Sequence, residues 1–290
     1  MLSLKQLAQH YIEYQRTYNK RTSVSSCEHT IRELKRFWGE DKDMSSLSSV
    51  DVDGFINYRR VKSLKPVSIN KDLRVVKGML NYGVNSGLLS ELKFKIRLLR
   101  SPRKKELPLL SREEINKLLF IAKNPYKSMI LIAACTGLRL NEVLHLTWGD
   151  VRWEERMITV TPKGDWTPKS HQTRAIPVGE KLLLTLQSLR AMSLFQKDGD
   201  YVFPTRDGGV KVHNNVCREL QKIWMKAGLY KRGVPTLHHL RHNAASQMLN
   251  SGASIETVRQ ILGHSAITTT ALYLHSSDDL KKKAVEAVSF

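Results

Sequence analysis

The sequence predicts a mainly helical protein with one small β-sheet, divided into two domains. Apolar residues recur at helical spacing through the first hundred residues, a basic stretch with two prolines follows, and two short β-branched runs occur later among further helical patterns. A length of 290 residues also suits two hydrophobic cores better than one. We therefore expect a helical N-terminal domain over residues 1–96, a basic linker over 97–108 and an α+β domain over 109–290 that ends in a tail helix.

The helices of the first domain are predicted from the 3.6-residue period. In the first of them Leu4, Leu7, Tyr11 and Tyr14 fall on one face, and Ser3 can cap the N-terminus. By the same reasoning, helices are expected over residues 3–18, 25–38, 49–61 and 68–85.

The second domain begins with a capping box, in which Ser111 precedes Glu114 by three residues. Two short β-branched runs, Arg156–Thr161 and Thr173–Val178, are typical of strands, and the polar segment between them indicates an exposed hairpin loop. Helical patterns return after the hairpin. They run through about residue 249 and then over 258–262, 268–272 and from 279 onward.

The charge of the chain points to a polyanion as its partner. Lys and Arg number 47 against 27 Asp and Glu, a formal net charge of +20, and the calculated pI is about 9.9. The basic excess occurs on both sides of residue 105, which favours two domains that face one nucleic acid over a basic tail on a neutral protein. Charge kept only for solubility is the simpler alternative.

The remaining composition narrows the class further. Cys27, Cys135 and Cys217 are scattered and odd in number, so neither a disulfide framework nor a zinc site is indicated. The N-terminus lacks an apolar stretch of the signal-peptide type, and no run of about 18 apolar residues occurs. We expect a cytoplasmic protein with no membrane segment.

Three short motifs carry residues able to act on a phosphate. Arg139 follows Thr-Gly-Leu, where a glycine relaxes the backbone just before a helix, although pairing with Glu142 on the same helical face is the simpler interpretation. His238 and Arg241, three residues apart, present an imidazole and a guanidinium to one point. His238 and His242 also have the spacing of a zinc helix, but His239 stands where that motif needs glutamate.

The third motif is Leu-Gly-His264, which is followed nine residues later by Tyr273. A lone tyrosine at such a place is usually a packing residue. Together, however, these motifs resemble the tyrosine recombinase (phage integrase) family, in which they occur in the same order. One departure is His239, because the family commonly has an acidic residue there.

The resemblance implies that Tyr273 attacks a DNA phosphate and forms a 3′-phosphotyrosyl link, with no metal or other cofactor. Arg139 and Arg241 would hold the phosphate oxygens, His238 would accept the tyrosine proton, and His264 would hydrogen-bond the phosphate. The family's hairpin lysine, the acid for the 5′ leaving oxygen, lies eight positions before the proline of the second strand. That spacing selects Lys169 rather than Lys163.

The same resemblance implies how the protein works on DNA. The first domain would be a core-binding domain that clasps double-stranded DNA opposite the catalytic domain, and the tail would dock on a neighbouring copy in a tetramer on two DNA sites, or within its own chain. The expected role is a site-specific integrase of a phage or mobile element. A Xer-type resolvase of replicon dimers, a type IB topoisomerase and a non-catalytic DNA-binding relative are the alternatives.

Overall fold

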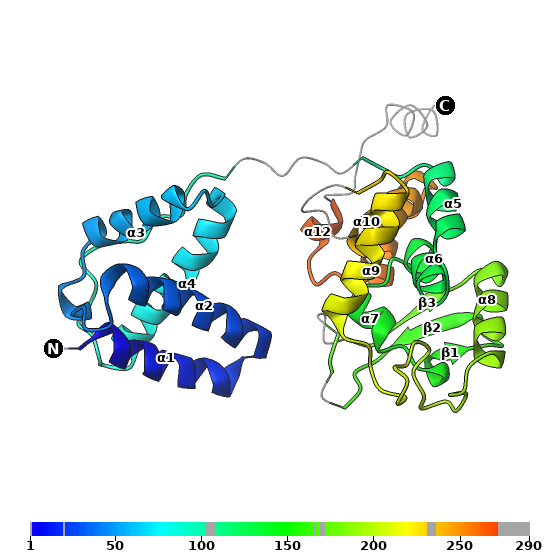
Figure 1. Ribbon diagram of the computed structural model, residues 1–290, viewed down its shortest axis with the longest axis horizontal. Helices are drawn as coiled ribbons and strands as arrows, with labels where there is room; N and C mark the ends of the chain where they lie inside the picture. Colours follow the sequence, from blue (N-terminus) through cyan, green and yellow to red (C-terminus); the bar gives the residue numbers. More distant parts are fainter. Residues whose placement is uncertain are drawn as a thin grey trace, which may run out of the picture. The chain divides into compact units, whose positions relative to one another are not determined.

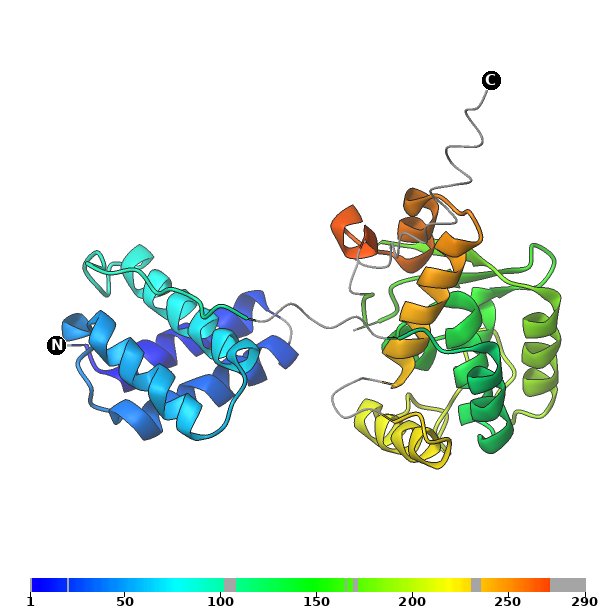
Figure 2. The same ribbon diagram turned by 90° about the horizontal axis from the view of Figure 1, so that it is seen from above.

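The chain folds into two compact units, Met1–Lys105 and Glu106–Phe290, shown in two views of the computed structural model (Figures 1 and 2). The structure describes residues 2–19, 21–101, 108–164, 166–168, 172–230 and 236–271, the side chain of Thr22 excepted. The division between the units falls inside the segment 97–108 that the sequence suggests as a linker. Each unit is described by itself.

The first unit is a bundle of helices in which α4 lies alongside both α1 and α2 (Figure 2). Ser3 caps α1 through a capping box with Gln6, as expected, and Pro66 occupies the first turn of α4, where no backbone N–H is needed. The helices are α1 (Leu4–Tyr18), α2 (Arg21–Trp38), α3 (Ser49–Val61) and α4 (Pro66–Asn85), with a short 3-10 helix η1 (Met44–Ser46) before α3.

A buried ionic cluster joins three helices of this unit. Arg59 of α3 pairs with Glu33 of α2, and its Nε donates to Asp72 Oδ2 of α4 at 3.0 Å. The Thr30 hydroxyl donates to the other oxygen of Asp72 at 2.8 Å. All three charged side chains are about 5% exposed, and Arg59 is the partner that Glu33 and Asp72 share. Glu33 also accepts from the more exposed Lys62, at 2.9 Å.

The second unit combines helices with a small antiparallel sheet of order β1-β2-β3. Ile158 of β2 pairs with Ile176 of β3, and both side chains are buried in the core of this unit. The two expected strands are present. The additional strand β1 has only two residues, too few for alternation to reveal it in the sequence.

The elements of the second unit follow one another along the chain in this order. They are α5 (Arg112–Ile121), α6 (Tyr126–Thr136), α7 (Leu140–Leu144), the 3-10 helix η2 (Trp148–Asp150), β1 (Val151–Arg152), β2 (Met157–Val160), β3 (Arg174–Pro177), α8 (Glu180–Ala191), α9 (His213–Lys226), α10 (Thr236–Asn250), α11 (Ile255–Leu262) and α12 (Ile267–Ala271).

Two helix ends determine where the chemistry-bearing residues lie. Gly137, at φ +67°, ends α6 in the left-handed conformation, and Arg139 follows as the first residue before α7. Gly263, at φ +66°, ends α11 in the same way, directly before His264. Helix α10 packs against α6, and α11 packs against both α10 and β3, so these two turns lie within one site.

Candidate active site

Two of the expected arginines converge on the C-terminal end of α11. Arg241, only 1% exposed, donates from Nη1 to the Gly137 carbonyl and from Nη2 to the Leu262 carbonyl, each at 2.7 Å. Arg139 donates from Nη2 to the Gly263 carbonyl at 3.3 Å and, weakly, from Nη1 to Leu262 at 3.5 Å. The end of a helix carries unpaired carbonyls and negative dipole charge, which suits both cations.

A buried carboxylate links Arg139 to a third arginine. Glu142, whose side chain is 2% exposed, accepts at Oε1 from Arg139 Nη1 at 2.9 Å and at Oε2 from Arg174 Nη2 at 2.7 Å. Burial opposes the charged form of Glu142, but Arg174 and Arg139 outweigh it and the pKa of the carboxyl is lowered. The pairing of Arg139 with Glu142 suggested by their spacing is therefore present, inside the site rather than on the surface.

Sequence reasoning missed Arg174. It lies on β3, its side chain is 8% exposed, and its Nε donates to the Ile261 carbonyl of α11 at 2.8 Å. The one signal in the sequence was a basic residue in an otherwise β-branched and apolar strand. Its partners, 32 and 87 positions away, are not visible from local pattern.

His264 is a buried and neutral member of the site. Its Nδ1 lies 2.9 Å from the Thr270 hydroxyl, and its carbonyl accepts from Arg259 at 2.8 Å. Burial, reinforced by the positive charges of Arg241 and Arg139, lowers the pKa of His264 to about 3. The imidazole is thus uncharged at neutral pH, because burial first and the neighbouring guanidiniums second oppose its protonation.

His238 lies exposed on α10, one turn before Arg241, and it also lowers the pKa of His264. The structure therefore brings Arg139, His238, Arg241 and His264 together in one region. Lys169 and Tyr273, the expected acid and nucleophile, lie outside the described residues.

The alternative hairpin lysine is held in place by other groups. Lys163 pairs with Asp150 and donates from Nζ to the His145 carbonyl at 3.0 Å. Its backbone N–H and carbonyl exchange two 2.8 Å hydrogen bonds with the backbone of Trp166. Lys163 thus anchors the base of the hairpin loop.

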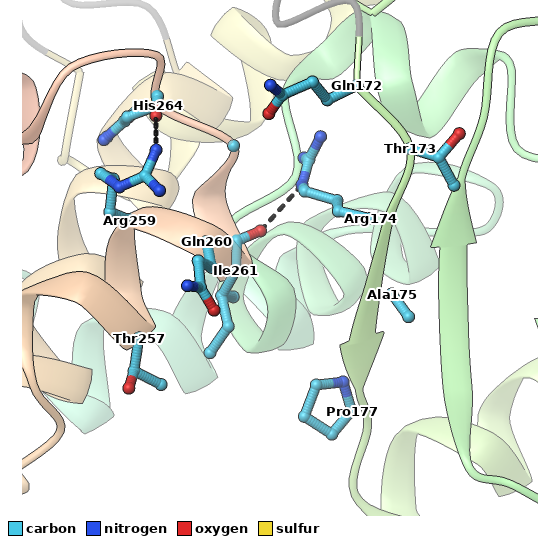
Figure 3. A pocket seen from close by; sticks show the side chains of 11 residues that line it. Gln172, Thr173, Arg174, Ala175, Pro177, Thr257, Arg259, Gln260, Ile261 and His264 are labelled. Atoms are coloured by element: carbon cyan, nitrogen blue, oxygen red, sulfur yellow. Dashed lines mark hydrogen bonds between the residues drawn. The ribbon is translucent and has the colours of Figure 1, made fainter.

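A cavity of about 430 Å³ lies between β3 and α11, next to these residues (Figure 3). Figure 3 shows Arg174 reaching from the strand toward the Ile261 carbonyl, and Arg259 bonded to the carbonyl of His264. Gln172 and Gln260 add amide groups to the lining. The lining mixes polar and apolar groups, and two of its side chains, Arg174 and Arg259, are cationic, which suits part of a polyanion.

The departure at His239 has a local explanation. The side chain is 3% exposed and its Nε2 donates to the Pro108 carbonyl at 2.8 Å, at the start of the second unit. Within the described ranges, no group of three or more His, Cys, Asp or Glu side chains is arranged to hold a metal ion. No described helix is both long and apolar enough to cross a membrane.

Comparison with known families decides the classification. The model of the phage integrase family matches residues 108–279, more than half of the chain, and the phage integrase SAM-like domain matches residues 3–100. The chain belongs to the phage integrase family. The resemblance seen in the motifs is therefore confirmed, and with it the activity of a tyrosine recombinase, site-specific cleavage and rejoining of DNA.

Curated relatives and solved structures agree with this family. A XerC-like tyrosine recombinase of Caldanaerobacter subterraneus subsp. tengcongensis is 29% identical over 85% of this chain and 72% of its own length. The tyrosine recombinase XerC of Pediococcus pentosaceus is 24% identical over 94% and 93%.

Among solved structures, the Tn1549 transposon integrase in complex with circular intermediate DNA has a TM-score of 0.83 at 22% identity, covering 99% of this chain and all of that one. A lambda integrase dimer bound to a core site has a TM-score of 0.76 at 16% identity, covering 93% and 95%. These likenesses confirm the expected fold class, a helical N-terminal domain followed by a mainly helical catalytic domain with a small sheet.

Proposed function

We propose that this family member recombines double-stranded DNA at specific sites through a transient 3′-phosphotyrosyl link to Tyr273. The observation that carries the proposal is the convergence of Arg139, Arg241 and the neutral His264 on the end of α11. A buried, positively charged site with a neutral hydrogen-bonding imidazole suits an anionic phosphodiester. It suits even better the more highly charged pentavalent transition state.

In this proposal the two arginines act as electrostatic clamps. Arg139 and Arg241 hold the non-bridging oxygens, and their forked guanidiniums keep their charge at any working pH. Their anchoring to main-chain carbonyls fixes them before DNA arrives, so little reorganisation accompanies the reaction. His264, kept neutral, hydrogen-bonds the phosphate without competing for a proton.

The proton transfers follow from the chemistry of the nucleophile and the leaving group. The Tyr273 hydroxyl, ordinarily with a pKa near 10, passes its proton to His238 as its oxygen bonds to phosphorus. The bond from phosphorus to the 5′ oxygen breaks, and Lys169 protonates that oxygen to give a free 5′ hydroxyl. Reversal onto a different strand completes exchange, and no ATP is needed because one phosphodiester replaces another.

Covalent capture tests the nucleophile. The protein is mixed, in EDTA, with a nicked duplex that carries the sequence it selects from a random DNA pool, and the adduct is resolved on a denaturing gel. We expect an adduct with wild type and with Tyr230→Phe, the matched loss of a hydroxyl in the same unit, but none with Tyr273→Phe. An adduct formed equally by Tyr273→Phe would overturn the assignment.

A sulfur substitution tests the choice between the two hairpin lysines. With sulfur in place of the bridging 5′ oxygen the leaving group departs without a proton, so a variant that lacks only the general acid regains its rate. We expect this rescue for Lys169→Ala. Lys163→Ala, which loses the contacts to Asp150 and the His145 carbonyl, should show none. Rescue of Lys163→Ala instead would reverse the assignment.

We further propose that the protein acts in the cytoplasm as a tetramer on two DNA sites and serves a phage or mobile element as its integrase. A Xer-type dimer resolvase is the second candidate, favoured by the names of the curated relatives. Two plasmid assays separate them. Integration of a circle that carries one site supports the first, and excision between two direct repeats without integration supports the second.

A further inference from the structure

We infer that Arg174 is a positioning residue of this site, which pairs with Glu142 and thereby keeps the guanidinium of Arg139 available to the DNA phosphate. The inference rests on the proposed function, because it concerns the same phosphate. It assigns a role to a residue that the mechanism above does not use.

The first step is the sharing of Glu142. Its Oε2 accepts from Arg174 Nη2 at 2.7 Å and from the backbone N–H of Arg139 at 2.9 Å, while its Oε1 accepts from Arg139 Nη1 at 2.9 Å. A carboxylate buried to this degree needs a full cationic partner. If Arg174 were absent, Arg139 would be that partner, and its charge would be neutralised by Glu142 and not by the DNA phosphate.

The second step is the balance of charge. The guanidiniums of Arg139, Arg174 and Arg241 oppose the single carboxylate of Glu142, which leaves two positive charges around the end of α11. A phosphodiester carries one negative charge, and the pentavalent transition state carries two. Removal of Arg174 would leave one positive charge, enough for the ground state but not for the transition state, so the effect should fall on rate rather than on binding.

The third step concerns the hydrogen bonds that Arg174 does not make. Its Nη1 is buried and, among the described residues, has no hydrogen-bond partner. The guanidinium also lies so close to Gly263 that a Cβ there would be 2.9 Å from Nη1. An unbonded charged donor destabilises the fold. Its presence favours a role for the charge over a role as a cross-link alone.

The competing explanation is purely structural. The Nε of Arg174 donates to the Ile261 carbonyl at 2.8 Å and so ties β3 to α11. A variant that loses only this tie should lower stability and slow every substrate equally. In a variant that loses the positive charge of Arg174, the cleavage rate should depend on the charge of the phosphate and on the charge of Glu142.

The test measures adduct formation on the nicked duplex by Arg174→Met, Arg174→Lys and wild type. By analogy with other outer partners of reactive groups, Arg174→Met should be slower by about 10- to 100-fold, with DNA affinity nearly unchanged. Arg174→Lys keeps the charge and should retain most of the rate. Arg190→Met is the matched control. Arg190, elsewhere in this unit, also donates to a main-chain carbonyl, that of Gln196, and pairs with a carboxylate, that of Asp198.

Two rescues distinguish charge from structure. Adding Glu142→Gln to Arg174→Met removes the carboxylate that captures Arg139, so the rate should rise above that of the single variant. A methylphosphonate at the scissile position removes the phosphate charge, so the ratio of wild-type to Arg174→Met rates should shrink. No rise in the double variant together with an unchanged ratio overturns the inference, as does a Lys variant as slow as the Met variant.

The outcomes separate this inference from the proposed function. If wild type forms no adduct, or Tyr273→Phe forms one, the proposed nucleophile fails. If wild type forms the adduct through Tyr273 and Arg174→Met is as fast, only the role of Arg174 fails.

Discussion

Replacement of Gly263 by alanine should slow DNA cleavage, whereas the same change at Gly228 should not. Both glycines have positive φ, +66° at Gly263 and +71° at Gly228, and both follow a helix of the second unit. An added Cβ at Gly228 meets no heavy atom within 4 Å, but at Gly263 it lies 2.9 Å from Arg174 Nη1 and 3.0 Å from its Cζ. The pair therefore separates backbone strain from displacement of Arg174.

The magnitudes follow from these contacts. An alanine in the left-handed region costs about 1–2 kcal/mol, the whole effect expected for Gly228→Ala. At Gly263 the guanidinium must also move away from Glu142, and a hydrogen bond to a charged group contributes about 1.5–3 kcal/mol. Gly263→Ala should therefore lower the free energy of unfolding by about 2.5–5 kcal/mol.

Urea denaturation of the full chain measures the stability difference, and adduct formation on the nicked duplex measures the rate. We expect Gly263→Ala to be slower than wild type by about 10- to 100-fold and Gly228→Ala to match wild type. Equal cleavage rates for the two variants, at temperatures where both are folded, would refute the reasoning.

Three further predictions concern buried ionisable groups. Glu142 has a lowered pKa in the folded state, so its contribution to stability is present above its ordinary pKa near 4.5 and is lost as the pH falls through the lower folded value. The free energies of unfolding of wild type and Glu142→Gln, measured by urea denaturation, should therefore converge in acid. A difference that stays constant with pH would contradict this. His264, with a pKa of about 3, should show no imidazole protonation above pH 5 by NMR. The stability linked to this group should decline as the pH falls from about 6.5 toward 3, because the unfolded chain then binds a proton that the folded protein does not. An NMR titration midpoint near pH 6.5 would exclude the buried, neutral state. Arg59→Met should lower the free energy of unfolding of the first unit by about 3–5 kcal/mol, because it leaves two buried carboxylates without their shared partner. Lys62→Met, the loss of an exposed partner of the same cluster, is the control and should cost less than about 1 kcal/mol.

Local pattern was sufficient to predict most of the fold. The helical period and caps located α1, α3 and α5 closely, since their signals lie within one turn of each helix end. Helix α2 begins at Arg21 rather than near residue 25, because its first turn is polar and carries no apolar period. The strand β1 was not predicted, because two residues cannot show an alternation of apolar and polar side chains.

The site was only partly predictable because its geometry depends on distant contacts. Motifs near the turns at Gly137 and Gly263 pointed to Arg139 and His264, and the spacing of His238 and Arg241 within α10 pointed to Arg241. Nothing local distinguishes Arg174 from any basic residue of a strand, since its hydrogen-bond partners lie in α7 and α11. The ion pair of Lys163 with Asp150 was hidden for the same reason.

The acceptors at the end of α11 are main-chain atoms, and this bears on how far sequences can diverge. Ile261, Leu262 and Gly263 hold three guanidiniums through their carbonyls, and a carbonyl is present whatever side chain the residue carries. What has to persist is a helix that ends there, followed by glycine, because a Cβ at that position would meet the guanidinium of Arg174. Distant homologues are therefore better recognised by a helix that ends in glycine beside two arginines and a histidine. The side chains of the residues whose carbonyls bind those arginines are a weaker guide.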